Sequence, residues 1–115
     1  MNLEEMSMED IWSEIDKRLN ENRSPIEGMN TTYSLELTGE EGGVYGLKFA
    51  EGEAEIINGD PGEVDCSLKM SVGDFKKLLA GNLNSTASFM MGKLKVKGNI
   101  GLALKLENLL KQYQF

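Results

Sequence analysis

The residues that could carry out chemistry in this chain are carboxylates, amines and a single thiol. The 115 residues include 19 Asp and Glu, 12 Lys and Arg, one cysteine and no histidine. Without histidine there can be no histidine-based nucleophilic triad, no HExxH metal site and no imidazole proton shuttle. No GxGxxG or P-loop string occurs, and the carboxylates are concentrated in one helical segment and in turns, where solvation explains them. The sequence therefore predicts no catalytic residue, no metal ligand and no cofactor.

The thiol belongs to Cys66, which lies in a run of alternating character from Val64 to Met70. Alternation of this kind is typical of a half-buried strand, so we expect Cys66 to be a small buried hydrophobe rather than a nucleophile. One cysteine excludes an internal disulfide and suits a reducing compartment. The acidic start resembles no secretory signal or transit peptide, and the end carries no peroxisomal address. The expected location is the cytoplasm.

Charge is divided unevenly along the chain. Residues 1–65 carry 17 acids and 4 bases, a net charge of −13, whereas residues 66–115 carry 2 acids and 8 bases, a net charge of +6. One interpretation is that the two halves neutralise each other within one fold. The other is a basic face, formed by Lys93, Lys95 and Lys97 with Lys76 and Lys77, that contacts an anionic membrane surface or a partner. Nucleic acid is not expected to bind an acidic chain that has no aromatic residues among these lysines.

Residues 87–110, ASFMMGKLKVKGNIGLALKLENLL, hold a turn, a strand and a helix in succession. Gly92 permits a left-handed exit from the apolar turn before it. Residues 93–97 alternate strictly, with Leu94 and Val96 on one face and three lysines on the other, which predicts a half-buried strand. Asn99 can cap a last helix that begins near Ile100. This passage can close one side of an apolar cavity, or it can simply close a core.

The remaining elements follow from hydrophobic spacing. Ser7 and Asp10 resemble a capping box, and an apolar stripe through Trp12 predicts a first helix that ends between Asn22 and Pro25. Alternating or apolar runs separated by turn residues predict strands over residues 32–37, 44–49, 54–57 and 64–70, and short loops favour antiparallel hairpins. Trp12 is expected to pack in the core.

Helical segments are predicted over residues 71–79 and 85–91 and from Ile100 onward. The last helix has a broad apolar face made of Leu102, Leu106, Leu109, Leu110 and Tyr113. Ile100 and Leu104 project roughly opposite, although a surface helix is usually apolar on one side only. Either the start of this helix tucks under a neighbouring element, or this side faces a ligand or a second subunit.

The length of the chain suits one domain, residues 1–115. The run GNLNSTASFMMGKLKVKGNIGLALKLENLL is very similar to the C-terminal half of the sterol carrier protein type 2 (SCP-2) lipid-binding domain. The shared features are a Gly-Lys-Leu-Lys strand after a short apolar helix, here from Gly92 to Lys95, and a Gly-Asn step into a helix rich in Leu and Lys. The helix from Ser71 to Leu79 also matches. The resemblance covers nearly the whole chain, and its specific motifs lie in the last 45 residues.

This resemblance implies an α+β fold in which a five-stranded mixed, largely antiparallel sheet has helices packed on one face and encloses an apolar tunnel. It also implies non-catalytic binding and transfer of a long-chain lipid, such as a fatty acid, a fatty acyl-CoA, a phospholipid or a sterol. Carried over by position, the lipid-binding residues are Phe75, Leu79, Phe89, Met90, Met91, Leu94, Val96, Leu102 and Leu106. Each of them could equally be an ordinary core residue.

Two departures from the family pattern affect this interpretation. Many members have glutamine directly before the Gly-Lys pair, where this chain has Met91, and many begin the second strand with tryptophan, where this chain has Val44 and Tyr45. The first departure removes a polar contact to a ligand headgroup. The alternative function is an accessory or interaction module of the same fold in lipid or quinone metabolism, with Ile100 and Leu104 at its interface. The sequence leaves the oligomeric state open.

Overall fold

The computed structural model describes residues 2–115, which form short 3₁₀ turns, four α-helices and five strands. In chain order the elements are η1 (Leu3–Glu5), α1 (Met8–Glu21), η2 (Ser24–Ile26), β1 (Thr31–Thr38), β2 (Gly43–Ala50), β3 (Glu53–Asn58), β4 (Cys66–Ser71), α2 (Val72–Leu79), α3 (Ser85–Met90), β5 (Lys95–Gly98) and α4 (Ile100–Lys111). The predicted order of helices and strands is therefore confirmed.

The strands form one sheet in the order β3–β2–β1–β4–β5. Three neighbouring pairs are antiparallel, whereas β1 and β4 run parallel, with Tyr33 opposite Cys66. After β1 the chain forms the β2–β3 hairpin on one side of β1, and it then returns as β4 on the other side of β1. The hairpin supplies the long connection that a parallel pair of strands requires. The mixed, largely antiparallel sheet is confirmed, and the parallel contact is the feature that short loops alone did not indicate.

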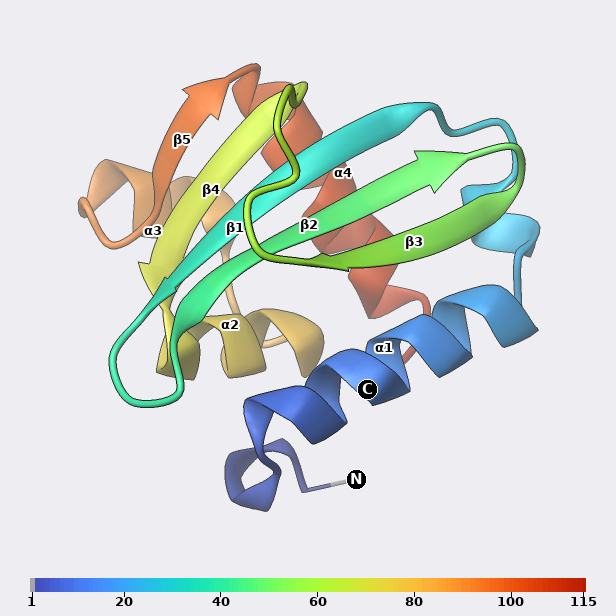
Figure 1. Cartoon of the computed structure of the whole chain (residues 1–115). Helices are drawn as coiled ribbons and strands as arrows, with labels where there is room; N and C mark the ends of the chain where they lie inside the picture. The colour runs from blue at the N-terminus through green and yellow to red at the C-terminus, as the bar shows by residue number, and fades with distance from the viewer. Residues whose placement is uncertain (1) are drawn as a thin grey trace.

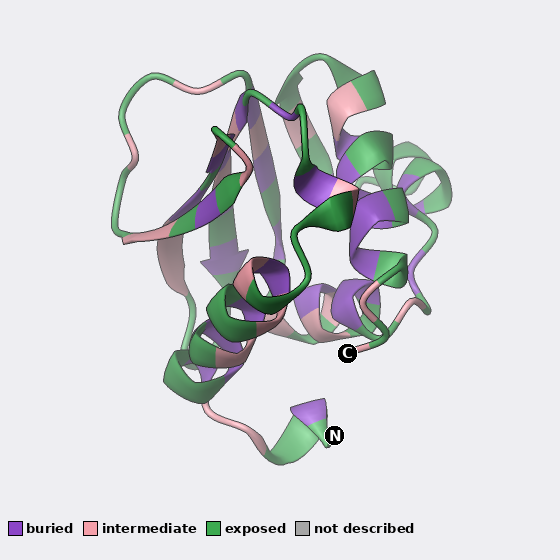
Figure 2. Cartoon of the chain, turned by 90° about the vertical axis from the view of Figure 1, so that its right-hand side faces the viewer, coloured by how far each residue is buried: buried purple, intermediate pink, exposed green. Residues whose placement is uncertain are grey.

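One face of the sheet is covered by helices and the other is not (Figure 1). α1 contacts β3, α2 contacts β1 and β4, and α4 contacts β4 and β5. Side chains that alternate along the strands follow this division, because Leu35, Leu47 and Leu68 are buried beneath the helices while Lys48 and Lys69 point away. In Figure 2 the buried residues gather where helices and sheet face one another. Among residues 2–115, no helix combines the length and apolar character needed to span a bilayer.

The first helix is fixed at its start by a cap and along its length by aromatic stacking. The Ser7 hydroxyl accepts a hydrogen bond from the Asp10 N–H at 3.1 Å, as the sequence predicted. Trp12 is buried and lies between two rings, with centroid distances of 4.7 Å to Tyr45 and 5.2 Å to Phe75. This stack joins α1 to β2 and α2, and it confirms the core position expected for Trp12.

Two strands begin later than the sequence predicted. β4 starts at Cys66 rather than Val64, because the Asp65 carboxylate and N–H instead bond to the Thr32 backbone. β5 starts at Lys95 rather than Lys93, because the Lys93 and Leu94 N–H groups donate to the Ser88 carbonyl. Leu94 is buried all the same, Val96 is half-buried and the three lysines are exposed, so the predicted faces of this segment are correct.

Candidate functional site

The structure separates the nine predicted site residues into an inner group and an outer group. The inner group lies between the sheet and the helices: Phe75, Leu79, Leu94 and Leu106 are buried, and Val96 and Leu102 are half-buried. The outer group lies at the surface, where Phe89, Met90 and Met91 are 43%, 80% and 67% exposed. The elements bring the inner group together, whereas the outer group projects away from it. Ligand contact by any of the nine remains a prediction.

The inner group comes from α2, from α4, and from β5 with the residue before it. α2 contributes Phe75 and Leu79, and α4 contributes Leu102 and Leu106. The Tyr33 hydroxyl of β1 donates to the Leu102 carbonyl at 2.8 Å and so ties the start of α4 to the middle of the sheet. Burial raises the pKa of Tyr33, with smaller contributions from Cys66 and Asp65. Its hydroxyl therefore remains a donor at neutral pH.

α3 buries two serines and exposes its large apolar residues. Ser85 and Ser88 are buried, whereas Phe89 and Met90 are exposed. The cause is hydrogen bonding at both ends of the helix. The Ser85 N–H donates to the Glu107 carboxylate of α4 at 2.7 Å, and the Ser88 carbonyl accepts from Lys93 N–H at 2.9 Å. These bonds turn the serine side of α3 toward α4, and they leave Phe89 partly exposed and Met90 largely exposed.

The end of α3 is a Schellman motif. Besides the bond from Lys93 to Ser88, the Gly92 N–H donates to the Phe89 carbonyl at 3.1 Å. Gly92 has a φ of +77°, the left-handed value expected for it from the sequence. The backbone of this turn therefore fixes the outward position of Met90 and Met91.

Glu107 is a structural residue that the sequence analysis missed. It is buried on α4, and its second carboxylate oxygen accepts from the Lys111 ammonium at 3.0 Å. Burial by itself would raise the pKa of Glu107, but hydrogen bonds from Ser85 and Lys111 outweigh burial and lower it. The Glu–Lys pair at i,i+4 was a visible signal in the sequence, although the bond to Ser85 depends on tertiary structure.

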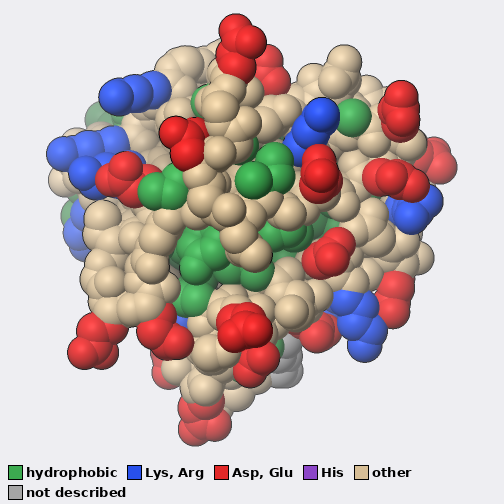
Figure 3. Space-filling model, viewed as in Figure 1, with side chains coloured by type: hydrophobic (Ala, Val, Ile, Leu, Met, Phe, Trp, Pro, Cys, Tyr) green, Lys and Arg blue, Asp and Glu red, His purple; other side chains and the backbone are tan. Residues whose placement is uncertain are grey.

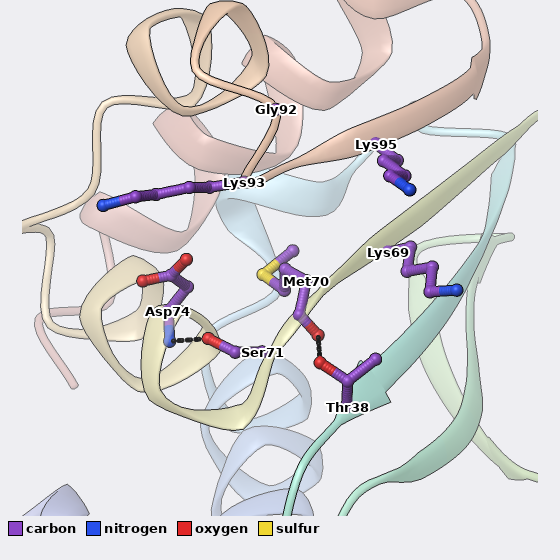
Figure 4. A pocket seen from close by; sticks show the side chains of 8 residues that line it. All are labelled: Thr38, Lys69, Met70, Ser71, Asp74, Gly92, Lys93 and Lys95. Atoms are coloured by element: carbon purple, nitrogen blue, oxygen red, sulfur yellow. Dashed lines mark hydrogen bonds between the residues drawn. The ribbon is translucent and has the colours of Figure 1, made fainter.

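One cavity lies beside the turn at Gly92 that follows α3. It opens between this turn, the ends of β1 and β4, and the start of α2 (Figure 4). Its volume is about 470 Å³, within the roughly 300–1,000 Å³ of small-molecule sites. Met70 supplies a buried apolar wall and belongs to the same core as the inner group. The remaining lining is mostly polar: Thr38, Lys69, Ser71, Asp74, Gly92, Lys93 and Lys95. We call this space the Met70 cavity.

A second cavity, of about 360 Å³, lies between α1 and the β2–β3 hairpin. Trp12, Tyr45 and Ile56 line it together with Glu9 and Asp16. The buried indole N–H of Trp12 has no hydrogen-bond partner among residues 2–115. An acidic rim disfavours an anionic headgroup at this place, whereas the lysines of the Met70 cavity favour one.

Neither of these cavities, nor the three others described among residues 2–115, is lined by any of the nine predicted residues. A ligand would reach the inner group only after these side chains re-pack. Ile100 and Leu104 are 38% and 36% exposed, and Leu104 lines a groove with Pro25 and Met29. Both side chains are therefore partly covered and partly open to solvent.

Cys66 carries the single thiol of the chain. Burial raises the pKa of the Cys66 thiol, aided by Asp65, and its Sγ lies 3.7 Å from the Asn99 carbonyl oxygen. Cys66 is thus buried, as its strand pattern predicted, and a thiol with a raised pKa is a poor nucleophile. Within residues 2–115, no three His, Cys, Asp or Glu side chains gather in a group able to hold a metal ion.

Comparison with known proteins gives one consistent result. The family model described as the SCP-2 sterol transfer family matches residues 13–111. The sterol carrier protein domain 2 of Helicoverpa armigera superposes with a TM-score of 0.75 at 25% identity, covering 99% of this chain and 93% of that one. The apo form of sterol carrier protein 2 from Yarrowia lipolytica superposes with a TM-score of 0.74 at 30% identity, covering 90% and 89%.

A curated relative, the hydroxysteroid dehydrogenase-like protein 2 of Mus musculus, is 40% identical over 88 residues. The match covers 76% of this chain but only 18% of the relative, so the chain spans about a fifth of that protein's length. Its name therefore describes a much larger protein and assigns no dehydrogenase activity to the matched segment. From the family match, the shared fold and the SCP-2-like motifs around Gly92, the chain belongs to the SCP-2 sterol transfer family.

Proposed function

We propose that this domain binds a long-chain lipid without catalysis and passes it to or from a membrane. Candidate ligands are a fatty acid, a fatty acyl-CoA, a phospholipid or a sterol-like molecule. The observation that carries the proposal is the Met70 cavity, whose apolar wall is continuous with the inner group and whose rim holds three lysines. Family membership supports lipid binding in general. The buried thiol of Cys66 fits a reducing compartment such as the cytoplasm.

An acyl chain bound among the inner residues needs no charged anchor. Each buried methylene contributes about 0.8 kcal/mol, so a sixteen-carbon chain gains roughly 12 kcal/mol in gross terms. Loss of translational freedom and ordering of the chain remove several kcal/mol of this gain. The remainder corresponds to a dissociation constant of about micromolar or somewhat below.

The headgroup is expected to lie at the rim of the Met70 cavity. Lys69, Lys93 and Lys95 can neutralise a carboxylate or phosphate, and the Ser71 hydroxyl, which accepts from Asp74 N–H, can donate to it. All three lysine side chains remain accessible to water, so their contribution is small and similar for different anions. Chain length should therefore affect affinity more than the choice of headgroup.

The test is a titration of the delipidated protein with fatty acids of increasing length. Calorimetry and Trp12 fluorescence measure the binding. Trp12 is a suitable reporter because it stacks on Phe75 of the inner group. We expect affinity to rise with chain length and then level off once the site is full. Tight binding of one length with failure of neighbours two carbons shorter or longer would contradict a permissive site.

A matched pair of variants distinguishes the two cavities as routes of entry. Thr38→Tyr places a ring at the Met70 cavity, and Ser13→Tyr places one at the cavity beside α1. Both positions are exposed, so neither change should unfold the protein. We expect only Thr38→Tyr to slow lipid association in stopped-flow measurements. The opposite result would place the entrance beside α1.

The second candidate function is an accessory module that binds a partner protein. The exposure of Ile100 and Leu104 on α4 favours it. Failure of every long-chain lipid to bind a folded, delipidated sample would support this alternative.

A further inference from the structure

The exposed large apolar side chains of the described chain fall into two places, and one of them adjoins a cluster of lysines. Phe89, Met90 and Met91 follow one another at the end of α3, and Ile100 and Leu104 lie on α4. We call the first group the apolar tip. Contiguous exposed apolar surface of this kind marks an interaction site more often than isolated apolar residues do.

The lysines lie directly after the apolar tip. Lys93, Lys95 and Lys97 are exposed, and none of them takes part in the ion pairs found among residues 2–115. Met91 and Lys95 are four residues apart, so at most about 14 Å separates their Cα atoms. Figure 1 shows α3 and β5 side by side at one edge of the molecule, and Figure 3 shows Lys and Arg side chains gathered on that side.

The lysine arrangement is unfavourable in the free protein. Lys95 stands directly opposite Lys69 in the antiparallel β4–β5 pair, and like charges at opposed positions destabilise a sheet. Lys69 is relieved in part by Glu36, whose carboxylate is 3.1 Å from its ammonium, whereas Lys95 has no such partner in the described chain. An anionic surface would remove the remaining repulsion.

We propose that the apolar tip and Lys93, Lys95 and Lys97 form a docking surface for a bilayer that contains anionic lipids. The tip would enter the boundary between headgroups and acyl chains, and the lysines would contact the phosphates. The acidic first half of the chain, with its net charge of −13, would be repelled and would turn this edge toward the membrane.

The composition of the surface favours a bilayer over a protein partner. Cores of protein interfaces are depleted in lysine, whereas this surface places three lysines directly after its apolar residues. The apolar tip also protrudes from the surface instead of forming a groove for a partner, since Met90 is among the most exposed apolar residues. Flexible methionine side chains are well suited to a fluid acyl-chain environment.

Docking to a bilayer can be measured separately from the binding of a lipid ligand, because vesicle flotation reports the first and titration in solution reports the second. Vesicle binding is measured by flotation with neutral phosphatidylcholine vesicles and with vesicles containing phosphatidylserine. We expect wild-type protein to bind the anionic vesicles and to be released as salt rises, because screening shortens electrostatic range to about 8 Å at physiological ionic strength. Equal binding to both kinds of vesicle, or to neither, would overturn the proposal.

Two multiple variants test the two components, each with a matched control. Lys93→Gln/Lys95→Gln/Lys97→Gln should weaken binding to anionic vesicles at least tenfold, because each lysine near such a surface contributes about fivefold. The control Lys17→Gln/Lys48→Gln/Lys105→Gln changes net charge equally at exposed positions elsewhere. An equal loss in the control would show a general charge effect and overturn the assignment.

For the apolar tip, Met90→Ser/Met91→Ser should weaken vesicle binding several-fold, whereas Ile100→Ser/Leu104→Ser should not. Equal effects of these two double variants would remove the tip from the docking surface. Binding of a neutral long-chain alcohol to the wild-type protein in solution is measured separately. Failure of the wild type to bind the alcohol, with vesicle binding intact, would contradict the lipid-binding function and not the docking surface.

Discussion

α2 and α3 are neighbouring short helices that begin alike and bury opposite kinds of side chain. Each has a capping side chain that accepts a backbone hydrogen bond at 3.0 Å, from Asp74 N–H to Ser71 and from Ala87 N–H to Asn84. α2 then buries Phe75, Leu78 and Leu79, whereas α3 buries two serines and exposes its apolar residues. A cap therefore fixes where a helix starts but not which face it buries.

The difference arises from what each helix packs against. α2 lies over β1 and β4, where the sheet offers apolar side chains, and it also contacts α4. α3 contacts α4, at the place where Glu107 presents a carboxylate to the Ser85 N–H. A buried carboxylate must keep its hydrogen bonds, so the polar side of α3 turns inward. The apolar side is left free for the lipid bilayer contact proposed above.

The largest expected effect comes from truncating the apolar face of α2. Phe75→Ala removes a fully buried ring from the stack with Trp12 and should lower the free energy of unfolding by about 3–5 kcal/mol. The matched change Phe89→Ala on α3 should cost about 0.5 kcal/mol or less. Urea denaturation measures both. Similar losses for the two variants would mean that the faces of α2 and α3 do not differ as described.

The next effect tests the polar anchor of α3. Glu107→Ala leaves the buried Ser85 N–H without its acceptor and should lower the free energy of unfolding by about 1–3 kcal/mol at pH 7. Glu107→Gln keeps an oxygen acceptor and should lose less. Equal losses for Ala and Gln would show that the charge of Glu107, rather than its hydrogen bond to Ser85, holds α3.

The same residue predicts a pH dependence. The pKa of Glu107 in the folded chain is lowered from its ordinary value of 4.5, so the unfolded chain takes up the proton first as pH falls. The stabilisation is therefore complete above pH 4.5 and is lost as pH falls through the lowered pKa of the folded state. The stability difference between wild type and Glu107→Gln should shrink in that window. A difference that grew on acidification would contradict the assignment.

Removing the N-cap of α2 or of α3 should lower the free energy of unfolding by a smaller amount, and by the same amount for both helices. Ser71→Ala and Asn84→Ala each remove one bond to a helix N-terminus and should each cost about 1 kcal/mol. Ser13→Ala, at an exposed position within α1, is the control and should be neutral. An Asn84→Ala variant as stable as wild type would show that α3 is held by Glu107 alone.

Much of this fold could be predicted from local pattern. Alternation predicted the strands that carry the buried Leu35, Leu47 and Leu68, and spacing predicted helices that start at Ser7, Ser71 and Asn99. These signals are local, since side-chain periodicity and capping involve residues that are close in sequence. The parallel pairing of β1 with β4 was not predicted from the residues, because it joins strands about 33 positions apart.

The outward face of α3 could not be predicted for the same reason. A helix containing Phe89 and Met90 would ordinarily bury them, and the resemblance to the SCP-2 domain implied a place for both in a lipid tunnel. Their exposure depends on Glu107, which lies 22 residues from Ser85, and on the Schellman motif at Gly92. Gly92 was recognisable from the sequence, whereas the partner of Glu107 was not. Whether these residues touch a ligand remains a prediction.

The smallest expected effect concerns the apolar tip itself. Met90→Ala and Met91→Ala should each change the free energy of unfolding by no more than about 0.5 kcal/mol, because exposed side chains lose little packing when they are truncated. Met70→Ala is the matched control, since Met70 is 3% exposed and its truncation should cost about 2–5 kcal/mol. Thermal or urea denaturation of the three variants provides the comparison. A loss above about 1 kcal/mol at Met90 would mean that α3 packs its apolar side against the domain in solution, and the contrast with α2 would then disappear. A neutral result at Met90 and Met91, together with weakened vesicle binding, would identify the tip as surface kept apolar for docking rather than for folding.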